Sequence, residues 1–229
     1  MRAHAIAMSR GKFITFEGGE GSGKSTQALQ LQAYLAGKGI ASVFTREPGG
    51  TPFAEAVRNF LLFGSARTAP GTPFSEALLF YSARADHVER KIQPALRDGT
   101  WVVCDRFSDS TRAYQGAAGG VPTATLLELE RIVLGGLKPD LTFVLDLPAE
   151  AGLKRAENRR LRELAPQSAT PERDLFEDRD VEFHERLRQG FLNIANAEPQ
   201  RCVVIDATQP IEAISRQVEH SLVQRLGPL

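Results

Sequence analysis

Cysteine is scarce in this sequence, and neither sign of charge dominates it. The 229 residues include two cysteines, Cys104 and Cys202, each inside an apolar run. This favours reduced core thiols in a cytoplasmic protein over a disulfide framework. Lysine plus arginine and aspartate plus glutamate are equal at 28 each. No net field therefore favours a nucleic-acid polymer or an anionic membrane as a partner.

Long hydrophobic runs and internal repeats are absent too. No apolar run approaches the roughly 20 residues that span a bilayer. Residues 1–10 lack a hydrophobic stretch long enough for a signal peptide, so we interpret them as a flexible tail. The length suits one α/β domain over residues 1–229, and two small domains are the less favoured alternative.

A glycine-rich segment carries the clearest chemical signal in the chain. Residues 18–25 fit the P-loop pattern G-x-x-x-x-G-K-[ST]. An apolar run at 12–17 predicts a strand before it, and helical spacing at 25–35 predicts a helix after it. With the following threonine, the predicted ATP-binding residues are Gly18, Gly19, Glu20, Gly21, Ser22, Gly23, Lys24, Ser25 and Thr26.

The order of strand, loop and helix explains how such a segment binds phosphate. It directs backbone N–H groups and the positive end of a helix dipole at one point. Glycines permit positive φ and a close approach to phosphate oxygens. Lys24 can then reach the β- and γ-phosphates, and the Ser25 hydroxyl can bind Mg²⁺. The alternative is a plain glycine turn, but motif and context together favour a nucleoside triphosphate site.

Four further apolar runs, at 41–45, 101–106, 141–146 and 202–206, predict strands that alternate with helices. This alternation predicts an α/β fold in which a five-stranded parallel sheet has helices on both faces. Right-handed crossovers should join its strands. Ligands of such sheets gather at the carboxyl ends of the strands.

Charged residues follow two of these strands. Arg46-Glu47-Pro48-Gly49-Gly50 comes after the second, where a second substrate would bind, although a surface turn is the alternative. The third ends in Asp105-Arg106. Asp105 can approach a Mg²⁺ ion and Arg106 can clamp a phosphate, although a simple salt bridge between them is the alternative.

A long helical pattern extends over 72–98, and Pro94 is expected to kink its last turn. Phe80 and Arg84 lie four residues apart on its flank, where a ring and a guanidinium could hold a nucleobase. The predicted core stripe of this helix is Phe74, Ala77, Leu78, Tyr81, Ala85, Val88, Ile92 and Leu96.

Near the C-terminal third, a helix at 149–160 becomes strongly basic and leads into an irregular segment at 163–173. Arginines beside such a segment predict a lid, at about 159–176, that closes over the transferring group.

Among P-loop proteins, several classes lack their marks here. The sequence has no Asn-Lys-x-Asp run of GTPases and no Leu-Ser-Gly-Gly-Gln signature of transport ATPases. A helicase would need a longer chain with a basic track for nucleic acid. A compact kinase with an acceptor pocket between the second and third strands remains.

Four motifs narrow the class of kinase that the sequence resembles. They are Thr45-Arg46-Glu47-Pro48-Gly49-Gly50-Thr51, Phe80-x-x-x-Arg84, Asp105-Arg106-Phe107 and Ser110-Thr111-x-Ala113-Tyr114-Gln115-Gly116. In content, order and spacing the chain resembles the thymidylate kinases, the bacterial form in particular. The resemblance implies a P-loop kinase that transfers the γ-phosphoryl group of ATP to dTMP, giving dTDP and ADP, with Mg²⁺. It also implies a homodimer, because relatives dimerise.

The resemblance further assigns roles to individual residues. Lys24 and Ser25 would hold the ATP phosphates and Mg²⁺, with Asp105 near the metal and Glu20 near the acceptor sugar. The implied acceptor site consists of Glu20, Arg46, Arg58, Phe80, Arg84, Arg106, Thr111, Tyr114 and Gln115. Within it the arginines at 46, 58 and 106 would hold the dTMP phosphate. Phe80 would stack on thymine, Arg84 would donate to it, and Tyr114 would disfavour a 2′-hydroxyl.

The catalytic set implied in this way is Lys24, Asp105, Arg106 and a lid arginine. One form of the family has an arginine inside the P-loop. Here that loop holds Glu20 and no arginine, so the resemblance implies that the catalytic arginine comes from the lid. Alignment favours Arg159, with Arg160 and Arg162 next. The lid departs from the family, since Asp174-Leu175 stands where Asp-Arg is usual and 164–171 is longer. A deoxynucleoside kinase and a non-enzymatic P-loop protein remain as rival functions.

Overall fold

The computed structural model describes residues 10–64, 69–163 and 175–229. Its centre is a sheet of five parallel strands in the order β2-β3-β1-β4-β5. The strands are β1 (Phe13–Glu17), β2 (Ser42–Arg46), β3 (Trp101–Asp105), β4 (Leu141–Asp146) and β5 (Cys202–Asp206). The predicted fold class and all five predicted strands are confirmed.

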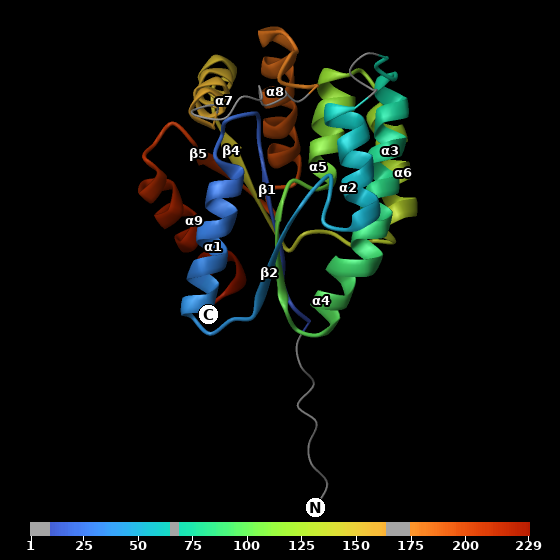
Figure 1. Cartoon of the computed structure of the whole chain (residues 1–229). Helices are drawn as coiled ribbons and strands as arrows, with labels where there is room; N and C mark the ends of the chain where they lie inside the picture. The colour runs from blue at the N-terminus through green and yellow to red at the C-terminus, as the bar shows by residue number, and fades with distance from the viewer. Residues whose placement is uncertain (1–9, 65–68, 164–174) are drawn as a thin grey trace, which may run out of the picture.

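Alternating side chains along β1 show how the sheet is covered on both faces. Ile14 and Phe16 pack with α1 (Lys24–Gly37) and α9 (Ile211–Leu226). Phe13 points to the opposite face, where it packs with the end of the long helical region and with α6 (Thr123–Leu134). Because successive side chains of a strand point to opposite faces, β1 contributes apolar residues to the core on each side of the sheet. Figure 1 shows α1 and α9 together on one side of the sheet.

The second face is completed by helices from the middle and the end of the chain. They are α3 (Pro73–His87), α4 (Gln93–Arg97), α5 (Ser108–Thr111) and α8 (Val181–Ala197), with π-helical turns η1 (Asn59–Phe63), η3 (Val88–Ile92) and η4 (Arg112–Ala118). Apolar residues of α8 and η4 form one cluster with Val144 and Cys202. Both cysteines are buried free thiols, as predicted.

The helix predicted over 72–98 is interrupted. It divides into α3, the wide turn η3 and α4, with Pro94 in the first turn of α4. Proline has no N–H and its ring crowds the carbonyl four residues earlier, which explains the wide turn just before it. The predicted stripe is wrong at Phe74, Leu78 and Ala85, which are exposed.

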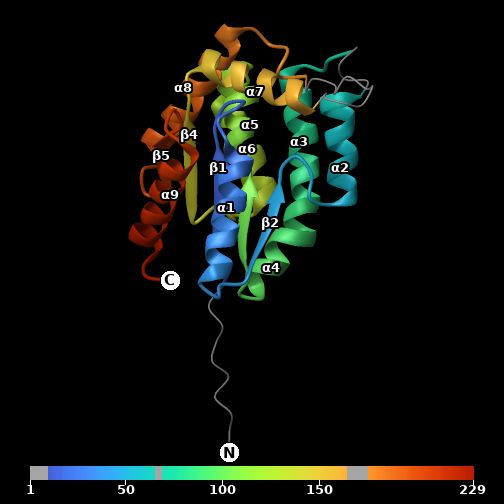
Figure 2. The same ribbon diagram turned by 60° about the vertical axis from the view of Figure 1, so that its left-hand side comes forward.

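Helix α2 (Pro52–Arg58) was not predicted. The Thr51-Pro52 pair in the sequence is typical of a helix start. Thr51 caps the helix by accepting a hydrogen bond from the Ala54 N–H at 3.2 Å, and Pro52 occupies the first helical position. Figure 2 shows α2 and α3 side by side near the end of β2, and α7 (Ala149–Glu163) across the same edge of the sheet. No helix in the described ranges has the length and apolar character of a membrane span.

Candidate active site

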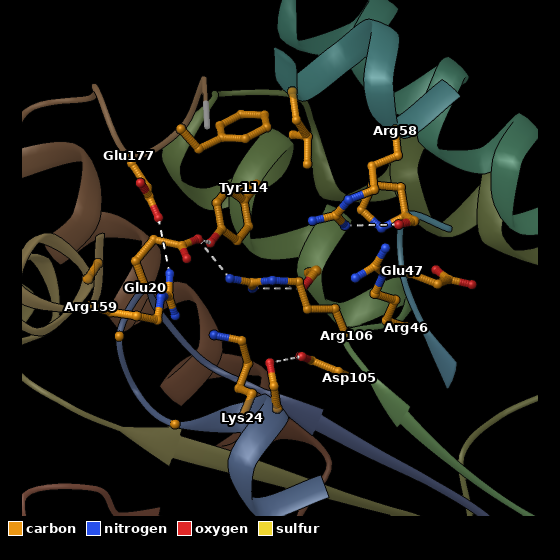
Figure 3. A pocket seen from close by; sticks show the side chains of 18 of the residues that line it. Glu20, Lys24, Arg46, Glu47, Arg58, Asp105, Arg106, Tyr114, Arg159 and Glu177 are labelled. Carbon is orange, nitrogen blue, oxygen red and sulfur yellow. Dashed lines mark hydrogen bonds and ion pairs between the residues drawn. The ribbon is translucent and has the colours of Figure 1, made fainter. Parts of the chain in front are cut away.

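A cavity of about 980 Å³ opens at the carboxyl edge of the sheet. It extends from the P-loop after β1 to the charged ends of β2 and β3, and α3, η4 and α7 form its walls (Figure 3). The sheet order explains this position, because the chain leaves β1 toward β2 and later crosses to β4 on the other side. The site residues predicted from sequence that line it are Glu20, Gly21, Gly23, Lys24, Ser25, Thr26, Arg46, Arg58, Phe80, Arg84, Asp105, Arg106, Thr111, Tyr114, Gln115 and Arg159.

The P-loop has the backbone shape that its glycines predict. Gly18, Gly21 and Gly23 have φ values of 138°, 66° and 92°, a region that residues with a side chain rarely adopt. A Cβ at Gly21 would also lie 2.1 Å from the Gly152 carbonyl oxygen, and one at Gly18 would lie 2.5 Å from that of Leu145. The loop is therefore packed against the end of β4 and the first turn of α7.

Lys24 is held inside this loop. Its Nζ donates to the Gly19 carbonyl at 2.6 Å and to Ser22 Oγ at 3.3 Å. The side chain is buried, and burial, followed by the charge of Arg106, lowers the pKa of Lys24 to about 8. Of the predicted ATP-binding residues, Gly18, Gly19 and Ser22 do not line the cavity.

Ser25 and Asp105 meet at the mouth of the loop. The Ser25 hydroxyl donates to Asp105 Oδ2, and Asp105 Oδ1 is buried without a hydrogen-bond partner among the described residues. One hydroxyl and one carboxylate with a spare oxygen fit Mg²⁺, which binds few protein groups and takes its other ligands from phosphates and water. The described residues contain no cluster of three or more metal-binding side chains. A metal bound here would therefore need the nucleotide.

Arg106 pairs with the P-loop acid and not with Asp105. Its Nη2 lies 2.7 Å from Glu20 Oε1, and its Nη1 donates to the Gly18 carbonyl at 3.0 Å. Burial would raise the pKa of Glu20, but Arg106 and Lys24 outweigh it and lower the pKa to about 2. The same carboxylate accepts from the Tyr114 hydroxyl, so Glu20, Arg106 and Tyr114 form one group between the two halves of the cavity (Figure 3).

Glu17 supports this group from behind, and sequence reasoning missed it. Its carboxylate accepts hydrogen bonds from the Phe107 N–H at 2.7 Å and from Ser110 Oγ at 2.6 Å. Burial, followed by the charge of Asp109, raises the pKa of Glu17 to about 8. An acidic residue at the end of the apolar run of β1, where the side chain is buried, could have indicated that Glu17 belongs to the site.

The opposite end of the cavity combines rings with buried polar groups. Phe80 and Tyr114 are nearly buried, and the Phe176 ring packs against both, with centroids 6.2 and 5.1 Å away. Gln115 Nε2 donates to Glu76 Oε2 at 3.1 Å, and Arg84 Nη2 donates to Thr111 Oγ1 at 3.1 Å. The flank position predicted for Phe80 and Arg84 is thus an interior wall.

The remaining predicted arginines surround the opening. Arg46 lies 3.3 Å from Glu55 and is half exposed, and Arg58 donates to the Pro48 carbonyl at 3.0 Å. Arg159 on α7 lies 3.5 Å from Glu177 Oε1. Most of the predicted lid, including Arg173 and Asp174, lies outside the described residues.

Comparisons with known proteins agree with this arrangement. A sequence model described as thymidylate kinase matches residues 16–218. The chain belongs to the thymidylate kinase family. It is 50% identical over 220 residues to a thymidylate kinase of Caulobacter vibrioides, with 96% of this chain and all of that one covered. It is 49% identical to that of Rhodopseudomonas palustris, covering 96% and 92%.

A solved structure extends the similarity to three dimensions. The crystal structure of thymidylate kinase from Ehrlichia chaffeensis aligns with a TM-score of 0.70 at 33% identity. The alignment covers 93% of this chain and 99% of that one. The family consists of ATP-dependent nucleoside monophosphate kinases, which are transferases, so the sequence-based recognition of the family is confirmed.

Proposed function

We propose that this chain transfers the γ-phosphoryl group of ATP to dTMP, giving dTDP and ADP, with Mg²⁺. One observation carries the proposal: a P-loop and an aromatic pocket with a buried arginine line a single cavity. Phosphoryl transfer requires mainly that donor and acceptor lie close together and that charge on the moving group is neutralised. A cavity of this composition suits that task.

On the donor side, Lys24 binds the β- and γ-phosphates, while Ser25 and Asp105 hold Mg²⁺. When bound, the metal neutralises charge that develops on the phosphate oxygens. Asp105 has an oxygen available for this, since Oδ1 is buried and without a partner among the described residues. Arg106 is already fixed by Glu20 and the Gly18 carbonyl, so it offers a rigid positive charge between donor and acceptor.

On the acceptor side, Arg46 and Arg58 bind the phosphate of dTMP together with Arg106. Phe80 stacks on the base, and Arg84 donates to one of its carbonyl oxygens. Thr111 and Gln115 form the rim. Arg46 can leave Glu55 at small energetic cost, because an exposed pair of this kind contributes about 0–1 kcal/mol.

A coupled assay of ADP release across the nucleoside monophosphates tests the function. We expect dTMP to be the preferred acceptor and thymidine to be inactive. Preference for thymidine would support a deoxynucleoside kinase instead, since an acceptor without a 5′-phosphate has no use for Arg46 and Arg58. A panel with no acceptor at all would favour an ATP-binding protein without this activity.

Tyr114→Ala is expected to improve use of the ribonucleotide. Tyr114 is nearly buried and bonds to Glu20, so its ring can crowd the sugar. Removing it should lower the ratio of kcat/KM for dTMP over UMP roughly tenfold. Tyr34→Ala on α1, which does not line the cavity, serves as the control. An unchanged ratio would remove the role proposed for Tyr114.

We also infer a cytoplasmic homodimer built from single-domain chains. Exposed apolar side chains lie on neighbouring helices, with Phe53 on α2, Phe74 and Leu78 on α3, and Leu127 on α6. Several large exposed apolar side chains on adjoining helices are typical of a protein interface. Light scattering should give twice the 25.1 kDa of one chain, and a mass of one chain at micromolar concentration would contradict the dimer.

A further inference from the structure

The Arg84 guanidinium is fixed on three sides. Nε donates to Glu47 Oε2 at 2.6 Å, while Nη2 donates to the Phe107 carbonyl at 3.2 Å and to Thr111 Oγ1 at 3.1 Å. Nη1 is buried and has no hydrogen-bond partner in the described part of the chain. Because Arg84 lines the cavity, this nitrogen is the one left for a ligand.

Glu47 holds Arg84 and is itself held by a histidine. Its second oxygen, Oε1, lies 2.9 Å from His87 Nδ1, and His87 Nε2 lies 2.7 Å from Thr45 Oγ1. Glu47 is almost fully buried, and His87 is completely buried. Burial would raise the pKa of Glu47, but Arg84 and His87 outweigh it and keep the pKa below its usual range. The ionised carboxylate only accepts, so His87 Nδ1 is the donor.

The turn after β2 closes over the same histidine. A Cβ at Gly50 would lie 2.5 Å from His87 Nε2 and 2.7 Å from Thr45 Oγ1. Gly50 has φ +88°, and its N–H donates to Glu55 at 3.0 Å. The turn therefore packs directly against the Nε2 edge of the imidazole, on the side opposite its bond to Glu47.

We propose that His87 and Glu47 are positioning residues that fix the Arg84 guanidinium, with Nη1 directed at a carbonyl oxygen of the acceptor base. This inference rests on the proposed function. His87 does not line the cavity, and both carboxylate oxygens of Glu47 are engaged, one by Arg84 and one by His87, so both residues act through Arg84. A carbonyl suits the Nη1 donor, whereas the amino group of cytosine presents hydrogens to it. The relay therefore sets the preference for dTMP over dCMP.

His87→Leu removes both hydrogen bonds of the imidazole. We expect KM for dTMP to rise roughly tenfold and KM for ATP to stay within about twofold, as for other partners that orient a binding group. The ratio of kcat/KM for dTMP over dCMP should fall by a similar factor. His87→Asn retains a donor near the position of Nδ1 and should recover most of the loss. His220→Leu, an exposed position on α9, should change none of these values.

A measurement without turnover separates this inference from the proposed function. The Arg84 Nε–H resonance, assigned by its loss in Arg84→Lys, should exchange with solvent at least tenfold faster in His87→Leu than in the wild type. An unchanged exchange rate would overturn the relay. So would an equal loss of dTMP and dCMP turnover together with a lowered Tm, which indicates a structural role only. A wild type inactive on dTMP but active on another acceptor would contradict the function and leave the exchange result standing.

Discussion

Lys24→Ala is expected to lower kcat/KM on the order of 10³-fold while the fold survives. Lys24 is a buried lysine that lines the cavity, and its bonds to the Gly19 carbonyl and Ser22 Oγ hold Nζ within the P-loop. Arg106, the neighbouring buried cation, is committed to Glu20 and the Gly18 carbonyl and so does not replace Lys24. Initial rates with saturating dTMP, together with circular dichroism and thermal unfolding, measure the effect.

Lys38→Ala provides the matched control. Lys38 is exposed at the other end of α1, where its Nζ lies 5.4 Å from the centre of the Tyr34 ring. Its loss should leave kcat and KM unchanged. Wild-type turnover in Lys24→Ala would refute the assignment of the ATP site, whereas loss of the folded state would require the comparison to be repeated with Lys24→Met.

The lowered pKa of Lys24 also predicts how ATP binding depends on pH. In the free site the pKa is about 8, so the amine loses its charge as the pH rises through 8. A bound triphosphate favours the charged form and raises the pKa. ATP binding should therefore take up protons between pH 8 and 9 and weaken as pH rises. Calorimetry in two buffers of different ionisation enthalpy should show this uptake in the wild type and not in Lys24→Met.

Local sequence signals were sufficient for the sheet and the phosphate loop. In β1, Ile14 and Phe16 face one side of the sheet and Phe13 faces the other, as the alternation in the sequence predicts. The strand is buried on both faces. Gly18, Gly21 and Gly23 adopt positive φ as expected. These features depend on a residue and its near neighbours, and so they can be read from one chain.

Features that depend on distant partners could not be read in this way. Phe74 and Leu78 have the spacing of a core stripe, yet both side chains are exposed on α3. The spacing of apolar residues shows that a helix has an apolar face, but it does not show which residues of that face meet the rest of the protein. Arg106 was weighed as a partner of its neighbour Asp105, but the fold brings Glu20 closer. Nothing in the sequence around His87 indicated a function for it. Its position became clear only in the structure, where the turn at 45–50 contacts its ring.

The lid arginine is the other place where a large effect is expected. Arg155 donates to the Ala207 carbonyl at 2.9 Å, and Arg160 bonds to Glu157 on its own helix. All three line the cavity. Arg159 differs in that 58% of its side chain is exposed and its ion-pair partner, Glu177, lies 3.5 Å away. Such a pair contributes about 0–1 kcal/mol. Charge stabilisation by an arginine in phosphoryl transfer can be worth about 4–7 kcal/mol, so Arg159 can exchange Glu177 for phosphate.

Arg159→Ala should therefore lower kcat by roughly 10³–10⁵-fold and leave KM for ATP and dTMP within about threefold. The contact gains strength as charge develops in the transition state, so ground-state binding should change little. Single-turnover kinetics in a quenched-flow instrument separates the chemical step from product release. Lys154→Ala removes an exposed cation of the same helix, one that does not line the cavity, so it is the matched control and should retain activity. A silent Arg159→Ala with a large loss in Arg162→Ala or Arg173→Ala would show that another arginine meets the transferring group.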